Sequence, residues 1–429
     1  MSHYTAKSAY KQLAERLDRF PQGAPGSETL FKILRMLFEE KEARLVSQLP
    51  IKPFTAEKAA HIWKCSISHA DSVLEKLADR ALLLDLEHRG IKQYMLPPPM
   101  AGFFEFALMR VRADLDQKLL SQLYHQYLQV EEDFIKDLFF GGETRLGRTF
   151  VQEGVLSSEQ AIHILDYERA SYYIESATHI GISMCYCRHK NQHLGQACSA
   201  PMDICMTFNQ TAAALIRRDY ARPAEAVEGL ELLHKAWEHN LVQCGENVRE
   251  GVSFICHCCG CCCEALVAAR KYGILQPVHT TNYIPVIGEN PCSSCELCVR
   301  TCPIGAISMV ENGDKTDNTV CFDEDICLGC GVCARICPCS SILLQYRGER
   351  IITPVNSVHR IVLMAIERGK LPHLIFDNPA YLTHRGMAAL LSAILKMPLL
   401  KRAMASRQLK SVYLERLIQR ALPPEETSS

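Results

Sequence analysis

Cysteines in one stretch of this chain stand at spacings that suit metal ligation. Three cysteines at three-residue steps, a fourth cysteine four residues on and then a proline occur twice: Cys292, Cys295, Cys298 and Cys302 before Pro303, and Cys327, Cys330, Cys333 and Cys337 before Pro338. Three thiolates on one tight loop can bind three corners of a [4Fe–4S] cube, and the fourth, turned away by the proline, can bind a neighbouring cube. Paired zinc knuckles are the alternative, but zinc does not require this doubled order.

This segment resembles the bacterial-type two-cluster ferredoxins, and the resemblance extends to Gly305-Ala306-Ile307 and Leu328-Gly329. It implies that each [4Fe–4S] cluster takes three cysteines from one motif and one from the other. The implied sets are Cys292, Cys295, Cys298 and Cys337 for one cluster, and Cys327, Cys330, Cys333 and Cys302 for the other. It also implies that the two clusters lie close enough for fast electron exchange. Cys321 and Cys339 fall outside the motifs, and we expect both to be small buried core residues.

A second group of cysteines precedes the ferredoxin-like segment. Short apolar strands lead into its loops, where backbone N–H groups can point at cluster sulfurs and Arg188 can offset negative charge. We predict at least one further metal site here, an iron–sulfur cluster. The leading ligands are Cys185, Cys187, Cys198 and Cys205, with Cys256, Cys258, Cys259 and Cys261 completing that site or building a second one.

Two other interpretations of these upstream cysteines stay open, a structural zinc site and a reduced cysteine cluster without metal. Cys258-Cys259-Gly260 also resembles the CCG motif of heterodisulfide reductases, which would imply an unusual cluster with thiol chemistry. Four histidines flank this region: His179, His189, His193 and His257. Each could bind metal or carry protons, but we assign none as a ligand. No phosphate loop, dinucleotide fingerprint or nucleophile motif is visible, so we assign no catalytic residue.

The distribution of cysteine indicates a reducing compartment. Of the 22 cysteines, all but Cys65 lie between Cys185 and Cys339, so one stretch of chain is built around sulfur ligation. The chain opens without an export signal, and no apolar run reaches the ~20 residues that a membrane span needs. We therefore expect a cytoplasmic protein, in oxygen-poor surroundings, whose thiols bind metal and do not form disulfides.

Periodicity and composition predict an α+β multidomain protein with five parts. Helix, turn, helix and hairpin follow one another in residues 1–100, an order that resembles a winged-helix domain. A helical connector is expected over 101–179, and a Cys-rich α/β metal-binding domain over 180–290. The dicluster ferredoxin domain is expected over 291–345, and a helical basic C-terminal region over 346–429.

Charge patterns bear on the partners. The helix expected over residues 66–80 has a net charge of −1, so we expect the winged-helix-like part to dock a protein and not nucleic acid. Residues 396–420 hold seven Lys/Arg and one Glu at helical spacing. Such a basic helix can lie on an acidic partner or on an anionic membrane surface, or its charged face can simply be solvated.

These observations predict an electron-transfer iron–sulfur protein with two [4Fe–4S] clusters and a further metal centre. It would act as a subunit or partner of an anaerobic redox enzyme, because no flavin or nicotinamide site is visible. One alternative is an iron–sulfur redox sensor that regulates transcription through the winged helix. Another is a small-substrate reductase with its active site at the upstream cysteines.

Overall fold

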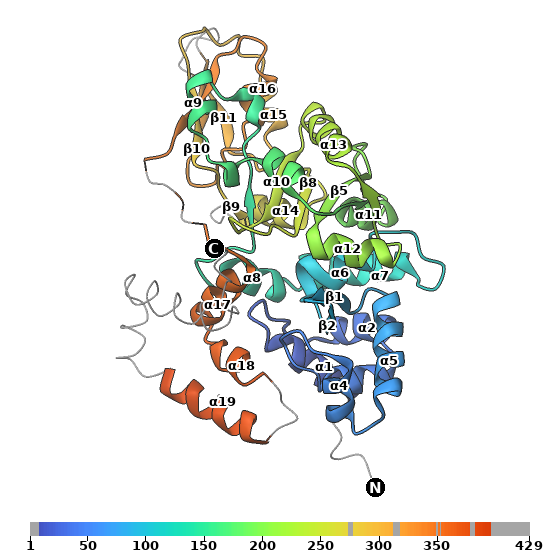
Figure 1. Cartoon of the computed structure of the whole chain (residues 1–429). Helices are drawn as coiled ribbons and strands as arrows, with labels where there is room; N and C mark the ends of the chain where they lie inside the picture. Colours follow the sequence, from blue (N-terminus) through green and yellow to red (C-terminus); the bar gives the residue numbers. More distant parts are fainter. Residues whose placement is uncertain are drawn as a thin grey trace, which may run out of the picture.

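The computed structural model describes residues 8–272, 278–311, 318–348, 351, 353–377 and 382–395. Figure 1 shows the N-terminal helices at one end of the molecule, a seven-stranded sheet in the middle and two small sheets at the opposite end. The mixture of helices and several sheets agrees with the predicted α and β content.

Five helices and a hairpin make up the N-terminal module: α1 (Ala9–Asp18), α2 (Glu28–Leu37), α3 (Glu40–Val46), α4 (Ala56–Trp63), α5 (Ile67–Asp79), β1 (Leu84–His88) and β2 (Ile91–Met95). The hydroxyls of Thr55 and Ser66 cap α4 and α5, which fixes where each helix begins. Arg89 and Gly90 join the strands, both with positive φ, as a two-residue hairpin turn requires. The expected order of helices and hairpin is present, and the winged-helix assignment itself stays a prediction.

The segment that follows is helical for most of its length but includes one strand. Its elements are η1 (Pro99–Phe103), α6 (Phe104–Phe106), α7 (Gln117–His125), η2 (Gln126–Val130), α8 (Asp133–Phe140), β3 (Gly147–Thr149), η3 (Glu153–Val155), α9 (Ser158–His163), η4 (Asp166–Glu168) and α10 (Ala170–Ser176). The earlier helices share one apolar core with the N-terminal module, in which Phe104 stacks on Tyr124. In contrast to the helical connector expected over 101–179, β3 is a strand of the central sheet, because its buried backbone pairs with two other strands.

The central sheet has the strand order β6-β4-β5-β8-β7-β3-β9, and only β3 and β9 run parallel. Its remaining strands are β4 (Ile180–Met184), β5 (Asp203–Phe208), β6 (Arg222–Ala224), β7 (Val242–Glu246), β8 (Phe254–Cys258) and β9 (Val278–His279). The helices between them are α11 (Tyr186–His193), α12 (Asn209–Arg217), α13 (Ala226–Glu238) and α14 (Glu264–Tyr272).

The two faces of this sheet differ in chemistry. On one face, Ile174 of α10 and Leu233 of α13 pack against Ile182 and Met206. Side chains alternate along a strand, so Cys205, the neighbour of Met206, belongs to the opposite face. That second face is covered by α12 and carries the sulfur chemistry described below.

Two similar halves form the far end of the molecule: β10 (Tyr283–Ile287), α15 (Leu297–Thr301), β11 (Ile307–Glu311), β12 (Asn318–Phe322), α16 (Val332–Ile336) and β13 (Ile342–Tyr346). β10 pairs with β13 and β11 with β12, both antiparallel. The two short helices α15 and α16 contact each other. Each motif therefore forms a loop and a short helix, with a strand of a two-stranded sheet on either side.

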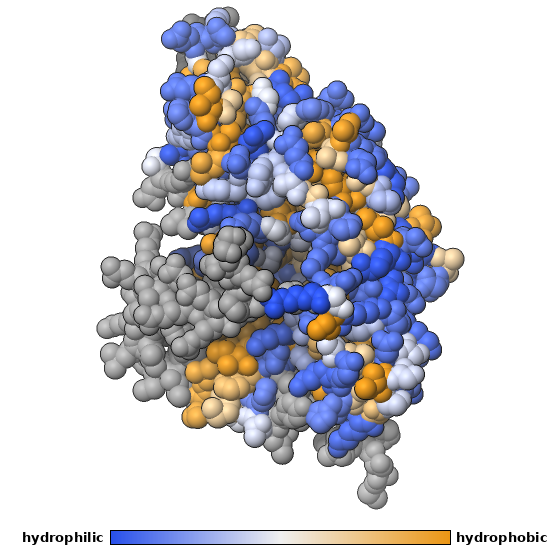
Figure 2. Space-filling model, viewed as in Figure 1, coloured by the Kyte–Doolittle hydropathy of each residue, from blue (hydrophilic) through white to orange (hydrophobic). Residues whose placement is uncertain are grey.

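The C-terminal helices are α17 (Ser357–Glu367), α18 (Leu371–Ile375) and α19 (Leu382–Leu395). A buried ion pair fixes α17 to the sheet, with Arg360 Nη2 2.7 Å from Glu246 Oε1. Figure 2 shows an apolar patch over α19, where Met387 and Leu390 are exposed. The basic stretch at 396–420 lies outside the described residues. Within the described part of the chain, every helix is too short or too polar to cross a membrane.

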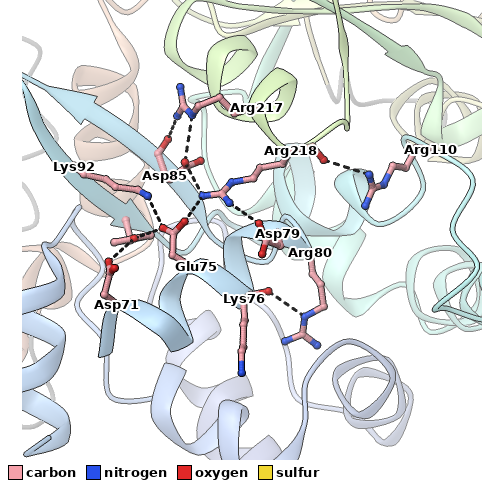
Figure 3. A network of polar contacts seen from close by, with 11 residues as sticks. Asp71, Glu75, Lys76, Asp79, Arg80, Asp85, Lys92, Arg110, Arg217 and Arg218 are labelled. Carbon is pink, nitrogen blue, oxygen red and sulfur yellow. Dashed lines mark hydrogen bonds and ion pairs between the residues drawn. The ribbon is translucent and has the colours of Figure 1, made fainter. Parts of the chain in front are cut away.

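A polar network joins the N-terminal module to the central sheet domain (Figure 3). Arg218, just after α12, donates to Glu75 of α5 at 2.9 Å and to Asp85 of β1 at 3.0 Å, and it also contacts Asp79. Arg217 forms a second ion pair with Asp85. The acidic side of α5 therefore binds the neighbouring domain. The same acidic charge is the reason that the sequence predicts no nucleic-acid binding by this helix.

Candidate metal centres

The first ferredoxin-like cavity, called cavity I, is lined by four cysteines from both motifs. Cys292, Cys295 and Cys298 come from the loop before α15 and its first turn, and Cys337 follows α16. The other walls of the cavity are mostly apolar side chains such as Met309.

Cavity II has the reciprocal composition. It is lined by Cys327, Cys330 and Cys333 of the second motif and by Cys302 of the first. The structure thus brings together, around each cavity, the four cysteines that the resemblance assigns to one cluster. The roles of these residues as ligands remain a prediction.

Around both cavities, backbone N–H groups donate to cysteine sulfur atoms and so favour the thiolate form. Four backbone N–H groups point at motif thiols at 3.2 to 3.4 Å: those of Ser294 to Cys292, Ala306 to Cys302, Gly329 to Cys327 and Ser341 to Cys337. Burial raises the pKa of Cys337, but the N–H groups of Ser341, Cys339 and Ile342 outweigh it and leave that pKa below its usual value. Sulfur donors, N–H groups and apolar walls together fit a thiolate-bound cluster.

The two cysteines outside the motifs do not line either cavity. Cys321 is exposed, which corrects the expectation of a core residue. The reason is the alternation of β12, in which Val320 faces the core and the next side chain faces outward. Cys339 is half-buried.

The upstream cysteines fall into two groups, and the first is compact. We call it the four-thiol group: Cys198, Cys259, Cys261 and Cys262. Their sulfur atoms all lie within 4.8 Å of one another. Cys198 Sγ is 3.6 Å from Cys259 Sγ and 3.9 Å from Cys262 Sγ, while the Sγ atoms of Cys261 and Cys262 are 3.6 Å apart. Four sulfurs at this separation suit a single metal centre.

The thiols of the four-thiol group differ in pKa. The hydrogen bond from Cys262 lowers the pKa of Cys259 to about 5, against the effect of burial and with help from the charge of Arg188. Burial and the charge of Cys259 raise the pKa of Cys261 to about 11. A thiolate is thus already favoured at Cys259, and thiolates are the form that binds metal.

Of the leading ligands predicted from sequence, only Cys198 belongs to the four-thiol group. Cys259 and Cys261, which were also predicted, belong to it as well. The remaining predicted ligands lie in a second group with Cys244 and Cys263: Cys185, Cys187, Cys205, Cys256 and Cys258. Sequence reasoning missed three cysteines of the two groups: Cys244, Cys262 and Cys263. Cys262 and Cys263 stand in the same run as predicted ligands, and strand register is the signal that would have found Cys244, which is paired with Cys256.

Arg188 lies between the two thiol groups. Its side chain is fully buried, and its Nη1 donates to the carbonyl of Pro201 at 2.7 Å. Burial lowers the pKa of Arg188, but the charges of Cys185 and Cys205 outweigh it and leave that pKa above the usual value. The expected role of Arg188, offsetting negative sulfur, agrees with this position.

Two of the flanking histidines, His189 and His193, are held by ordinary hydrogen bonds. His189 Nδ1 lies 2.8 Å from the carbonyl of Leu108, and His189 Nε2 lies 3.2 Å from His193 Nε2. Burial and Arg188 lower the pKa of His257 to about 3, so its ring is neutral. Among the described residues, the four-thiol group contains no histidine.

The upstream cysteines touch the dicluster end directly. A Cβ atom added at Gly260 would lie 2.2 Å from the carbonyl oxygen of Pro303, so only glycine allows the two loops to approach this closely. Gly260 stands between Cys259 and Cys261, and Pro303 follows Cys302 of cavity II. The four-thiol group and cavity II are therefore joined by a backbone contact.

Comparison with known proteins supports the assignment of the far end. A family described as a 4Fe-4S dicluster domain matches residues 291–341. No curated protein and no solved structure gives a significant match to the chain. The matched residues contain all eight cysteines of cavities I and II, and the chain therefore contains a 4Fe-4S dicluster domain.

Proposed function

We propose that this chain relays single electrons through two [4Fe–4S] clusters, held in cavities I and II, and a third metal centre at the four-thiol group. It serves as a subunit or partner of a larger redox enzyme. The observation that carries the proposal is the pair of cavities, each lined by three cysteines of one motif and one of the other. Each cluster takes one electron from a donor and passes it on, without making or breaking a bond.

The two short helices support rapid exchange between the clusters. α15 carries Cys298 to cavity I and ends at Cys302 of cavity II, and α16 connects Cys333 to Cys337 in the reverse sense. Four residues of helix rise about 6 Å, so each helix places its two cysteines one turn apart. The neighbouring walls of the cavities form one apolar core, which keeps water from between the clusters.

Exposure gives the relay a direction. Cys292 of cavity I is exposed, whereas Cys327 and Cys333 of cavity II are buried. Glu289, near Cys292, is exposed as well, whereas the exposed Glu296 pairs with Arg300. A partner with a basic surface would therefore exchange electrons at cavity I, while cavity II communicates with the interior and the four-thiol group.

Metal analysis of the full chain, purified without oxygen, tests this function. We expect about eight iron atoms and as many acid-labile sulfides from the dicluster domain. The four-thiol group adds about four of each if it holds an iron–sulfur cluster, or one zinc if that site is structural. Reduction by a low-potential donor should give two interacting cubane signals in paramagnetic resonance. A colourless protein that contains only zinc would contradict the proposal.

The regulatory alternative makes a distinct prediction, a salt-dependent retardation of duplex DNA by the holoprotein. We expect no retardation, because α5 presents the acidic side chains of Glu75 and Asp79 and no positive charge for DNA phosphate. Both side chains also bind Arg218 of the same chain. The same protein should accept electrons whether or not DNA is present.

A further inference from the structure

Seven upstream cysteines that lie apart from the four-thiol group form a continuous series of thiol contacts. We call them the seven-thiol group, in the order of contact: Cys256, Cys205, Cys185, Cys187, Cys263, Cys258 and Cys244. Each thiol in this order contacts the next. Cys185, Cys244, Cys258 and Cys263 are buried and the other three are half-buried, so the series lies in the interior.

The central sheet supplies the floor of this group. Cys244 of β7 pairs directly with Cys256 of β8, and Cys258 lies two residues further along β8. The register of β5 and β8 pairs Met206 with Ile255, which places Cys205 opposite Cys256. Directly opposed residues, and residues two apart, share a face of a sheet, so these four thiols point to the same side.

Two helices begin above this floor. Cys185 is the N-cap of α11 and Cys187 lies in its first turn, while Cys263 directly precedes α14. Backbone N–H groups of Ala265 and Leu266 point at the Cys263 thiol. The first N–H groups of a helix and its dipole favour negative charge, so both helix ends are suited to an anionic centre.

A buried cation faces the same space. Arg188 is fully buried, and its charge acts on the thiols of Cys185, Cys205 and Cys258. In the described part of the chain its hydrogen bonds go to carbonyl groups and no carboxylate pairs with it, while its Nε has no partner. An unpaired buried charge raises the free energy of the folded state, and neutral thiols alone do not remove that penalty. A negatively charged metal–thiolate centre does.

The neighbouring cation is already neutralised. Lys190 of α11 forms a buried ion pair with Glu264 at the start of α14. This pair also ties α11 to the start of α14. Arg188 is thus the cation left to balance the centre.

From these contacts we infer that the seven-thiol group is a separate iron–sulfur site, additional to the two dicluster sites and the four-thiol group. A zinc ion and a [4Fe–4S] cube each take four thiolates, so the number of thiols does not decide between them. Unlike the four-thiol group, the described seven-thiol group contains no three sulfur atoms that all lie within 4.8 Å of one another, and this wider spacing suits the larger cube. Cys244, Cys258 and Cys263 share one apolar core with Ile304 and Cys327 of the dicluster domain. The site therefore lies beside cavity II, at the inner end of the proposed relay.

The test compares three variants of the full chain, each purified without oxygen. Cys244→Ser with Cys263→Ser removes two members of the seven-thiol group and none of the others. We expect this variant to lose about four iron atoms and four acid-labile sulfides, with both cubane signals of the dicluster domain retained. Loss of zinc alone, or no loss of metal, would overturn the inference.

Two further variants separate this inference from the proposed function. Cys198→Ser with Cys262→Ser should remove only the metal of the four-thiol group, so each centre can fail independently. Cys321→Ser, in an exposed cysteine outside every group, is the matched control and should keep all metal. If the first variant does not fold, the Cys198→Ser with Cys262→Ser variant decides. About twelve irons in it support the seven-thiol site, and about eight leave none for that site and overturn the inference.

Discussion

The dicluster domain and the upstream region both gather cysteines, but they do so by different means. In the dicluster domain three members of each set stand on one loop, and a five-residue helix leads to the cysteine that joins the other set. In the upstream region, cysteines that are adjacent in sequence belong to different groups. Cys258 belongs to the seven-thiol group and Cys259 to the four-thiol group. Partners such as Cys198 and Cys262 come instead from distant parts of the chain.

This difference separates local geometry from tertiary geometry. A tight loop brings its cysteines together whatever the rest of the chain does, so its grouping follows from spacing. On a sheet the grouping depends on strand order and register, and a shift of one residue would turn a thiol to the opposite face. The upstream groups therefore depend on the whole central domain.

The largest loss of iron and of electron transfer is expected when one of the loop cysteines of the dicluster domain is replaced. Cys330→Ser removes one of three loop cysteines of cavity II, and a cube that loses a thiolate corner becomes labile. We expect about four irons to be lost and electron relay from the donor to be abolished, measured by iron analysis, paramagnetic resonance and the rate of acceptor reduction. Cys295→Ser should do the same at cavity I.

Cys321→Ser is again the control, since its side chain points away from both cavities. Two unchanged, interacting cubane signals in Cys330→Ser would show that the cavities are not the cluster sites.

The next effect sharpens the division of the upstream region. Cys187 and Cys198 are close in sequence, and a single site would lose about one cluster when both are replaced by serine. Because they lie in separate thiol groups, we expect the double variant to lose metal from both centres and each single variant from one. Iron, zinc and sulfide analysis of the three proteins decides; equal losses in both single variants and no additional loss in the double variant would contradict the division.

Particular residues show how far the sequence could lead. Thr55 and Ser66 cap their helices with local hydrogen bonds, so the starts of α4 and α5 depend on residues close in sequence. The sets of four around cavities I and II could be written down from spacing and resemblance. The strand β3 is three residues long and pairs with distant partners, so no local pattern indicated it. Cys244 stands alone in sequence, and only the register of β7 on β8 brings it to Cys256.

A smaller effect is expected where the two regions meet. Gly260→Ala places a methyl group against the carbonyl of Pro303, and the loops must separate by roughly 1 Å to relieve the contact. We expect slower electron exchange between cavity II and the upstream centres, with the iron content of the dicluster domain unchanged. Stopped-flow reduction with single-wavelength detection measures the slower phase. Gly154→Ala is the matched control, since a Cβ there meets nothing within 4 Å, and equal rates in both variants would show that this contact does not matter.

The smallest effect tests which region depends on the N-terminal module. Arg218→Ala removes the ion pairs to Glu75 and Asp79, which are partly exposed and together worth about 1 kcal/mol. It also removes one of two ion pairs of the buried Asp85, which keeps its pair with Arg217. Burial raises the pKa of Glu75, but the bonds from Lys92, Tyr94 and Arg218 outweigh it and lower that pKa to about 2. A lowered carboxyl pKa stabilises the folded state above the unfolded value of about 4.5, and this stabilisation is lost as the pH falls towards 2.

We therefore expect faster hydrogen exchange in α5 and α12 of Arg218→Ala than of wild type at pH 7, and a smaller difference at pH 4. Exchange in α15 and α16 should be the same in both proteins, because the dicluster loops hold their own geometry. Arg44→Ala, which removes an exposed ion pair with Glu40, should leave α12 unchanged and serves as the control. Faster exchange in α15 and α16 of Arg218→Ala would show that the dicluster domain, like the upstream region, depends on distant parts of the chain.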